Sequence, residues 1–216
     1  MTTPACVLLA RAPSAPGKTR LTATLSNDDA VALRRALLLD TYDAVCAAGV
    51  DVMVAFTPDD ALVEFQALLT RSGRRLIPQR GADLGARMHA AIAEACARGA
   101  DRVVLVGSDL PSLPPTHITD AFHGLETHDV VIGPAADGGY YLIGLRQPRE
   151  ELFAGVEWGS ARVLAQTVAR AEALQLSVAL IAPWFDVDTQ ADLRRVLTDA
   201  PPRAAATHTR SWTRRK

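Results

Sequence analysis

Two cationic residues stand close together near the start of the chain, where they could act on a phosphorylated substrate. Lys18 and Arg20 lie two residues apart on a segment restrained by Pro16 and Gly17. A lysine supplies a point charge and an arginine a planar two-pronged donor, so together they suit the oxygens of a polyphosphate. Two solvated loop cations are the alternative, and the pair alone does not decide between them.

Two acidic residues could complement these cations by holding a metal ion. Asp109 follows the apolar run of residues 101–107, where a carboxylate is costly to bury unless a cation compensates it. Mg²⁺ or Mn²⁺ suits such a place, since hard divalent ions bind carboxylates together with substrate phosphates. Asp188 is the predicted second ligand, with Asp186 as the alternative. Asp109 could instead cap its own turn, and Asp186 or Asp188 could cap the helix that follows.

A glycine-rich segment after residue 136 could bind the second substrate. Asp137, Gly138, Gly139 and Tyr140 combine an acid, two residues without a Cβ atom and an aromatic hydroxyl. Backbone can approach a ligand closely at such glycines, so Gly138, Gly139 and Tyr140 are predicted to contact an acceptor. Asp137 is predicted to orient or deprotonate an acceptor hydroxyl. A simple hairpin turn is the alternative.

Further polar residues could surround a nucleotide. Residues 79–88 form a polar loop that leads into a helical pattern, which Asp83 could cap. Backbone groups of this loop and of the loop after the first strand could line the nucleotide. The predicted nucleotide-binding residues are Ala10, Arg11, Ala12, Gly17, Gln79, Gly81, Gly85 and Ser108.

An alternation of strands and helices must position these residues. Helical patterns near residues 26–45, 59–71, 84–98, 115–125, 160–174 and 190–198 separate apolar runs at 5–10, 50–56, 74–78, 101–107, 128–133, 140–145 and 176–181. This order predicts a single-domain α/β fold with a mostly parallel open sheet and helices on both faces. Ligands bind such sheets at the carboxyl ends of the strands, where the polar motifs stand.

Composition excludes several classes of protein. The 216 residues are 49% apolar and 22% charged, which excludes disorder, collagen and coiled coils. No run approaches the roughly 18 apolar residues of a membrane-spanning helix. The N-terminal apolar stretch is short and follows no basic region, so a cytoplasmic protein is expected. The three cysteines, Cys6, Cys46 and Cys96, have unrelated spacings and are predicted to be buried reduced thiols.

The charge is unevenly distributed along the chain. Residues 201–216 carry five cations and no acid, so a net charge of −1 leaves −6 on the rest. The rest of the chain offers no matching basic stripe, so neither nucleic acid nor a membrane is expected as a partner. The prolines at its start and the small polar residues predict a flexible, solvated basic tail over 201–216.

The segment after the first strand also suggests an alternative fold. Residues 12–19 match a relaxed phosphate-binding loop of a P-loop NTPase or kinase, directly after a strand. However, Pro13 and Pro16 remove two backbone donors, and the first glycine of the motif is missing. The P-loop reading requires a helix that begins at Lys18, whereas we expect extended chain over 18–25 and a helix capped at 26–28.

Taken in order, the motifs KTRL, Q-x-G-x-DLG-x-RM, GSDLP, DGGYYLIGL and DVDT-x-x-DL resemble a known superfamily over residues 5–197. They look like the bacterial nucleotide-diphospho-sugar transferases with the GT-A, Rossmann-like fold. More narrowly, they resemble the branch labelled arsenosugar-biosynthesis or radical-SAM-associated glycosyltransferase. Relatives of that branch include 2-phospholactate guanylyltransferases and molybdenum-cofactor nucleotidyltransferases.

The resemblance implies a function and roles for the residues above. A transferase domain over residues 1–200 would hold a nucleotide, with Lys18 and Arg20 on its phosphates and a divalent metal on Asp109 and Asp188. It favours Mg²⁺-dependent glycosyl transfer from a nucleotide sugar to a small-molecule acceptor. The alternatives are transfer of a nucleotidyl group from a triphosphate to a phosphate or carboxylate, with release of pyrophosphate, and nucleotide binding without turnover. Fold alone does not choose among them.

Overall fold

Seven strands form one mixed sheet in the computed structural model, which describes residues 3–70, 75–199 and 205–215. The strand order is β3-β2-β1-β4-β6-β5-β7, and β6 is the member that runs antiparallel to its neighbours. The mostly parallel sheet is therefore confirmed. The strands are β1 (Pro4–Arg11), β2 (Asp51–Thr57), β3 (Arg75–Pro78), β4 (Arg102–Gly107), β5 (Val130–Pro134), β6 (Tyr140–Leu145) and β7 (Val178–Leu180).

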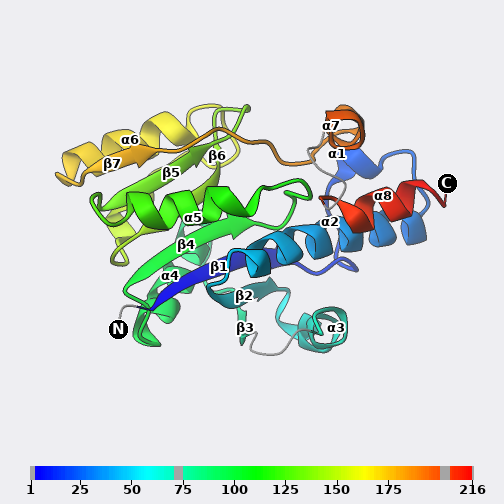
Figure 1. Cartoon of the computed structure of the whole chain (residues 1–216), viewed down its shortest axis with the longest axis horizontal. Helices are drawn as coiled ribbons and strands as arrows, with labels where there is room; N and C mark the ends of the chain where they lie inside the picture. The colour runs from blue at the N-terminus through cyan, green and yellow to red at the C-terminus, as the bar shows by residue number, and fades with distance from the viewer. Residues whose placement is uncertain (1–2, 71–74, 200–204, 216) are drawn as a thin grey trace.

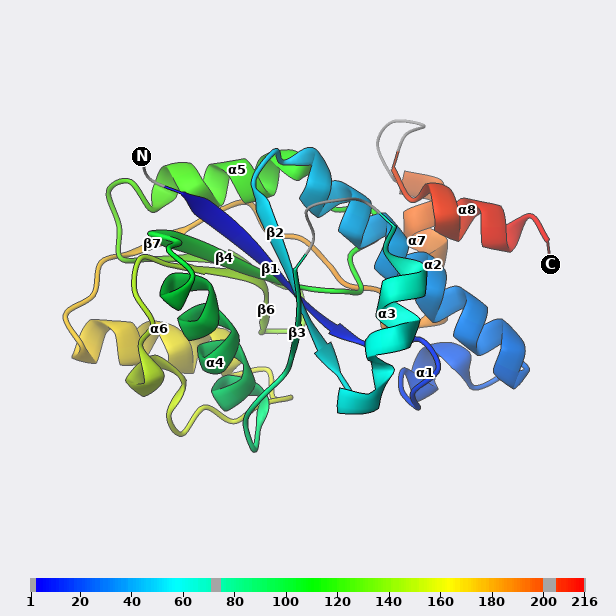
Figure 2. The same cartoon turned by 90° about the horizontal axis from the view of Figure 1, so that it is seen from below.

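Helices cover both faces of this sheet (Figures 1 and 2). The first half of the chain contributes α1 (Thr19–Thr22), α2 (Asn27–Ala47), η1 (Asp59–Ala61), α3 (Leu62–Leu68) and α4 (Leu84–Ala97). The second half contributes α5 (Pro115–Gly124), η2 (Glu150–Phe153), α6 (Val163–Ala173), α7 (Gln190–Asp199) and α8 (Thr207–Thr213). None of the described helices combines the length and apolarity that crossing a membrane requires.

The central strand β1 shows why the apolar runs are continuous. Its side chains alternate between faces, as the period of two in a strand requires. Cys6 and Leu8 pack with α2, α3 and α5, whereas Val7 packs with α4 and η2 on the opposite face. All three are fully buried, so a strand covered on both sides needs apolar residues at every position.

The ends of two helices follow the predicted capping chemistry. The Ser26 hydroxyl accepts a hydrogen bond from the Asp29 amide and begins α2. Asp83 accepts from the Ala86 amide over 2.8 Å and begins α4, so its carboxylate is used locally. At α7 the expectation was wrong: Thr189 accepts from the Asp192 amide in place of Asp186 or Asp188. Both acids are therefore available for other contacts.

The expected flexible tail is replaced, over the described residues 205–215, by a packed helix. Trp212 of α8 is buried in one apolar cluster with Leu33 and Leu37 of α2. Figure 1 shows α8 lying along α2, away from the strands. The Arg210 guanidinium donates to the carbonyls of Val196 and Leu197 in α7, which neutralises helix-terminal acceptors. This cation of the basic segment therefore pairs with backbone carbonyls. Residues 200–204 and 216 lie outside the described residues.

The segment after Lys18 differs from both sequence-based expectations. A helix of four residues, α1, follows Lys18, so the prediction of extended chain over 18–25 was wrong. That helix ends at Thr22, and the long helix begins after the Ser26 cap as predicted. A P-loop would require the long helix to start at the lysine. Here the helix that follows Lys18 ends after one turn.

The thiols are partly as predicted. Cys6 is fully buried, and burial raises the pKa of its thiol. Cys46 and Cys96 are only partly buried, and all three are free of disulfide bonds.

Candidate functional site

The acid after β4 is held in place by a buried hydroxyl. Thr41 of α2 is fully buried, and its Oγ1 accepts a hydrogen bond from the Leu110 amide over 2.9 Å. The one hydrogen of this hydroxyl is shared between the Leu37 carbonyl of the same helix, at 2.9 Å, and the Ser108 carbonyl, at 3.1 Å. Thr41 thus holds the backbone directly after Asp109 through the Leu110 amide, and it also lies against the backbone directly before it. A buried amide that has a fixed acceptor keeps its turn in place without help from solvent.

Two further acids, Asp186 and Asp188, lie on the segment that follows β7, residues 181–188. Backbone hydrogen bonds attach this segment to β5 and then to the β4 loop: the Ile181 amide donates to Ile132, Trp184 to Pro134 and Val187 to Asp109. Val187 is fully buried, whereas Asp186 and Asp188 on either side of it are only partly buried. Asp186 and Asp188 are thereby carried to Asp109.

The ammonium of Lys18 joins the two predicted metal ligands. Its Nζ lies 3.0 Å from Asp109 Oδ2 and 2.6 Å from Asp188 Oδ1. Arg20 Nη2 lies 3.2 Å from the second oxygen of Asp188. Because the Lys18 side chain is only 12% exposed, this cluster is more strongly coupled than an ordinary surface ion pair. The structure therefore brings together Lys18, Arg20, Asp109 and Asp188.

Lys18 reaches this position through an uncommon backbone conformation. Its φ is 55° and its ψ 40°, the left-handed region that side-chain-bearing residues rarely adopt. Such a conformation costs on the order of 1–3 kcal/mol and persists where surrounding contacts compensate it, often at functional sites. Here two carboxylates provide the compensating contacts.

The titration of these groups follows from burial and mutual attraction. Burial opposes the charge of Lys18, but Asp109 and Asp188 outweigh it, and the pKa of Lys18 is raised. The pKa of Asp109 is also raised, because burial exceeds the opposing effect of Lys18. Burial likewise opposes the charge of Asp188, but hydrogen bonding from Lys18 lowers its pKa overall. Burial and the charge of Asp188 raise the pKa of Asp186 to about 6.

The carboxylate pair fits a hard divalent cation. Oxygens of Asp109 and Asp188 both converge on the Lys18 ammonium, so they already share one positive charge. Carboxylate oxygens are the ligands that Mg²⁺ and Mn²⁺ prefer. Within the described part of the chain, no group of three or more acidic, histidine or cysteine side chains is arranged to hold a metal. A Mg²⁺ ion here would complete its coordination with water molecules and substrate oxygens, as it commonly does at sites with two carboxylates.

Two pockets meet at Asp109. The first, which we call the cationic pocket, has a volume of about 370 Å³ and includes Lys18 and Asp188. Both residues predicted to contact phosphates and half of those predicted to bind the nucleotide line this pocket. Its described lining includes Arg11, Ala12, Gly17, Lys18, Arg20, Arg34, Ser108, Asp109 and Asp188.

Arg34 is a cationic residue of this pocket that sequence reasoning missed. Its Nε donates to the Pro13 carbonyl over 2.8 Å, and its Nη1 lies 3.4 Å from the Gly17 carbonyl. The guanidinium thereby holds the loop that precedes Lys18. The signal was available, because Arg34 stands four residues before Leu38 on the core-facing side of α2.

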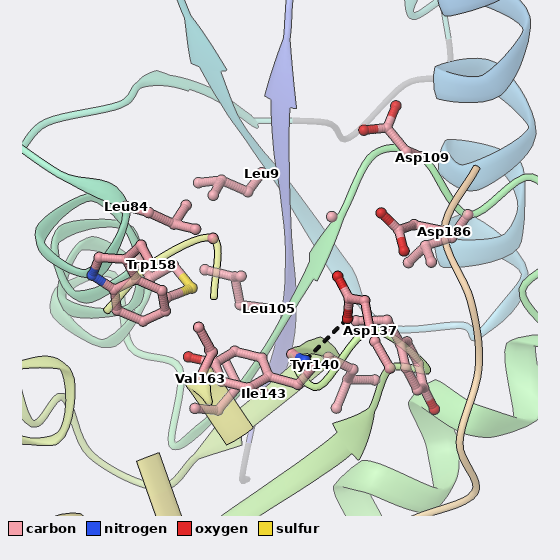
Figure 3. A pocket seen from close by; sticks show the side chains of 18 residues that line it. Leu9, Leu84, Leu105, Asp109, Asp137, Tyr140, Ile143, Trp158, Val163 and Asp186 are labelled. Atoms are coloured by element: carbon pink, nitrogen blue, oxygen red, sulfur yellow. Dashed lines mark hydrogen bonds between the residues drawn. The ribbon is translucent and has the colours of Figure 1, made fainter. Parts of the chain in front are cut away.

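The second, which we call the apolar pocket, has a volume of about 280 Å³ (Figure 3). Asp137 and Tyr140 of the predicted acceptor region line it, together with Gly139, and so does Asp186. Asp137 Oδ1 accepts from the Gly139 amide over 3.0 Å, which shapes the turn between β5 and β6. Gly138 adopts a φ of 88°, where its missing Cβ would collide with the backbone of Ala161. The segment is therefore a hairpin turn, as the alternative required. The same turn also contributes Asp137, Gly139 and Tyr140 to the wall of the apolar pocket.

Four predicted nucleotide-binding residues have structural contacts and do not line the cationic pocket: Ala10, Gln79, Gly81 and Gly85. Ala10 is buried in the core. The Gln79 amide nitrogen donates to the carbonyls of Ala10 and Ala55, over 3.0 and 2.8 Å, and ties the ends of β1 and β2 together. A Cβ on Gly81 would lie 2.7 Å from the start of α4, and one on Gly85 would lie 2.7 Å from the Trp158 ring. Close packing accounts for both glycines.

Comparisons with known proteins place the chain in a family. Residues 38–160 match the family model DUF2064, described as an uncharacterized protein conserved in bacteria. Phosphoenolpyruvate guanylyltransferase of Sphaerobacter thermophilus is 32% identical over 213 residues, covering 95% of this chain and 98% of that protein. 2-Phospho-L-lactate guanylyltransferase of Methanothermobacter thermautotrophicus is 28% identical over 202 residues, covering 92% and 84%.

A solved structure extends the likeness to the whole fold. The crystal structure of a candidate nucleotide-diphospho-sugar transferase from Desulfovibrio desulfuricans G20 superimposes with a TM-score of 0.88 and 34% identity. The match covers 100% of this chain and 95% of that one. The α/β fold expected from the sequence is therefore confirmed at the level of the complete chain.

Proposed function

The chain belongs to the DUF2064 family and is a transferase, and we propose that it transfers a nucleoside monophosphate from a triphosphate to a small acceptor, releasing pyrophosphate. The observation that carries this proposal is the cationic pocket, where Arg11, Lys18, Arg20 and Arg34 gather beside Asp109. A triphosphate brings more negative charge than a nucleotide sugar, and such a cluster matches it. The relatives named as guanylyltransferases support this choice and favour GTP as the donor.

In this reaction the cationic and the acidic side chains would have different roles. An anionic oxygen of the acceptor attacks the α-phosphorus, while the bond from that phosphorus to the oxygen bridging to the β-phosphate breaks. Lys18 and the arginines stabilise the departing pyrophosphate, which carries the electron pair of the broken bond. A divalent cation held by Asp109 and Asp188 would supply Lewis-acid stabilisation of phosphate oxygens. An acceptor phosphate or carboxylate needs no dedicated base.

Glycosyl transfer, which the sequence resemblance favours, is the second candidate. The likeness to the D. desulfuricans protein supports it, and Asp137 would then orient or deprotonate an acceptor hydroxyl. The guanylyltransferase names among the relatives favour nucleotidyl transfer instead. The narrower likeness to an arsenosugar-associated branch stays a prediction.

Product analysis separates the two reactions. The protein is incubated with Mg²⁺ and GTP, CTP, ATP or UTP, with phosphoenolpyruvate, 2-phospholactate or phenyl phosphate as acceptor, and pyrophosphate is measured. Nucleotide sugars are offered in parallel, and release of nucleoside diphosphate is measured. Acceptor-dependent pyrophosphate release with one triphosphate is the expected result. Release of nucleoside diphosphate from a sugar nucleotide, with no pyrophosphate from any triphosphate, would replace the proposal with glycosyl transfer.

A further inference from the structure

The apolar pocket lies on the other side of Asp109 from the cationic pocket, and its chemistry constrains the acceptor. Asp109 lines both pockets, whereas Asp188 lines the cationic one and Asp186 the apolar one. Acidic side chains are therefore found in both pockets and at the place where the two pockets meet. Figure 3 shows Asp109, Asp186 and Asp137 around one side of the apolar pocket and Leu9, Leu84 and Trp158 on the opposite side.

Phosphoryl-transfer geometry assigns an entry side to the acceptor, if the proposed function holds. The attacking and leaving oxygens lie roughly in line on opposite sides of the reacting phosphorus. With pyrophosphate leaving into the cationic pocket and the phosphorus beside Asp109, the attacking oxygen must come from the apolar pocket. The body of the acceptor then lies among the residues of that pocket.

Charge in this pocket disfavours a second anionic group on the acceptor. The charged side chains that line it are Asp109, Asp137 and Asp186, and none of its described lining residues is lysine, arginine or histidine. An unpaired carboxylate moved into such surroundings loses its hydration and gains repulsion. Phosphoenolpyruvate and 2-phospholactate, named for the relatives, each carry a carboxylate besides the phosphate.

The remaining surface of the pocket suits a ring or a branched chain. Leu9, Leu84, Met88, Ile143 and Trp158 present apolar atoms to it. The Trp158 and Tyr140 rings meet edge to face, with centroids 6.5 Å apart. Trp158 also packs against the backbone of α4 at Gly85, so this wall is held from behind. A cavity of about 150 Å³ is large enough to bind benzene. The apolar pocket is larger than that.

We propose that the acceptor is the monophosphate of a hydrophobic, ring-sized body that carries no second charge. This inference rests on the proposed nucleotidyl transfer and specifies its second substrate. One phosphate oxygen attacks the α-phosphorus of the triphosphate and forms a new P–O–P link. The bond to the pyrophosphate oxygen breaks, and pyrophosphate leaves without any proton transfer being required.

Phenyl phosphate and phosphoenolpyruvate are a suitable pair of probes. Both are small monophosphates, but one carries a ring and the other a carboxylate. Binding to the full-length protein is followed by the fluorescence of Trp158, with Trp158→Phe to identify its contribution. Pyrophosphate release with GTP and Mg²⁺ is measured alongside. We expect phenyl phosphate to bind at least tenfold more tightly than phosphoenolpyruvate and to give the larger kcat/KM.

A charge introduced at the mouth of the pocket should reverse this preference. Leu84 is 43% exposed at the first turn of α4, so Leu84→Lys can fold. We expect this variant to shift the ratio of the two dissociation constants at least tenfold toward phosphoenolpyruvate. Val63→Lys is the matched control, because Val63 is an exposed apolar residue of α3 that does not line the apolar pocket.

Each outcome decides for or against the inference. Equal binding of the two probes, or tighter binding of phosphoenolpyruvate, would overturn it. Displacement of phenyl phosphate by guanosine would assign the pocket to the nucleobase and overturn it as well. Pyrophosphate release with phosphoenolpyruvate but not with phenyl phosphate would reject the inference and leave the proposed function standing. Preferential binding of phenyl phosphate without pyrophosphate release from any triphosphate would support the pocket chemistry and reject nucleotidyl transfer.

Discussion

The amide of Val187 donates a hydrogen bond to the carbonyl of Asp109 over 2.9 Å. This one contact attaches the segment that carries Asp186 and Asp188 to the loop that those acids must face. Because the bond is between backbone groups, it survives substitution of the acids themselves. Side-chain variants can therefore test the chemistry of the site without detaching the segment.

Replacing Asp109 should remove metal-dependent nucleotide binding while the fold is retained. Asp109→Asn keeps the shape of the side chain but removes a charge that burial already disfavours, since the pKa of Asp109 is raised. We expect loss of Mn²⁺ binding in the presence of GTP, measured by electron paramagnetic resonance, with an unchanged circular dichroism spectrum. Asp60→Asn, at an exposed acid of η1, is the control. Retained Mn²⁺ affinity in Asp109→Asn would show that the ligand is wrongly identified.

Removing the charge of Lys18 should weaken binding of triphosphates selectively. Lys18→Met retains the length of the side chain and loses charge-assisted hydrogen bonds worth about 1.5–3 kcal/mol, or roughly 10- to 150-fold in affinity. Calorimetry should show this loss for GTP and almost none for guanosine. Arg98→Met, at the far end of α4, should leave both affinities unchanged. Equal losses for GTP and guanosine would indicate a structural role for Lys18.

The hydroxyl of Thr41 should contribute more to the free energy of unfolding than a hydroxyl on an exposed helix does. Thr41→Val leaves the Leu110 amide without its acceptor at a buried position, which should cost about 1–3 kcal/mol of unfolding free energy. Because this amide follows Asp109 directly, Mn²⁺ affinity should also fall. Thr119→Val on α5, where the hydroxyl donates to the Thr116 carbonyl, is the matched control for stability. Denaturant unfolding of both variants measures the difference.

The buried imidazole of His117 predicts a loss of stability in acid. Burial lowers its pKa from the ordinary value of 6.5, and its Nδ1 lies 2.8 Å from the Tyr141 hydroxyl. The unfolded chain therefore binds a proton more readily than the folded one. This contribution is fully present above about pH 6.5 and is lost as the pH falls through the lower folded value. Thermal unfolding from pH 7.5 to 5 should show it.

Variants of α5 isolate this effect from general acid sensitivity. His117→Asn keeps an amide near the position of Nδ1 and removes the titrating group, so its melting temperature should fall less steeply with acid. His123→Gln, an exposed position on the same helix, should follow the unsubstituted protein. Identical slopes for His117→Asn and the unsubstituted protein would contradict the assignment.

The C-terminal helix should depend on one buried acid. Asp40 of α2 accepts hydrogen bonds from the amides of His208 and Thr209 and from the Thr209 hydroxyl, at the first turn of α8. Asp40→Ala should lower stability by about 2–3 kcal/mol and increase amide hydrogen exchange across α8. Asp40→Asn retains one acceptor and should lose less. Unaltered exchange in Asp40→Ala would mean that apolar packing of Trp212 suffices.

The sequence by itself determined the order and type of the seven strands and of the longer helices between them, although it predicted neither α1 nor α8. Both faces of β1 are buried, so the apolar run at residues 5–10 had to be continuous, and continuity is visible without a structure. Local chemistry was equally visible: Ser26 and Asp83 cap the helices that follow them. The polar motifs at strand ends identified Lys18 and Asp109 because ligand sites of parallel sheets lie at those ends.

Only the tertiary structure decided which of these groups meet. Lys18 and Asp188 are 170 residues apart, and the contact between them depends on how the 181–188 segment crosses the end of the sheet. Gln79 matched a nucleotide motif, yet its amide nitrogen contacts two strand carbonyls. The basic C-terminal segment lacked any local sign of order, because its helix is stabilised by Asp40 and by the apolar surface of α2. Hydrogen bonds and burial between distant segments leave no local pattern in a sequence, whereas periodicity and capping do.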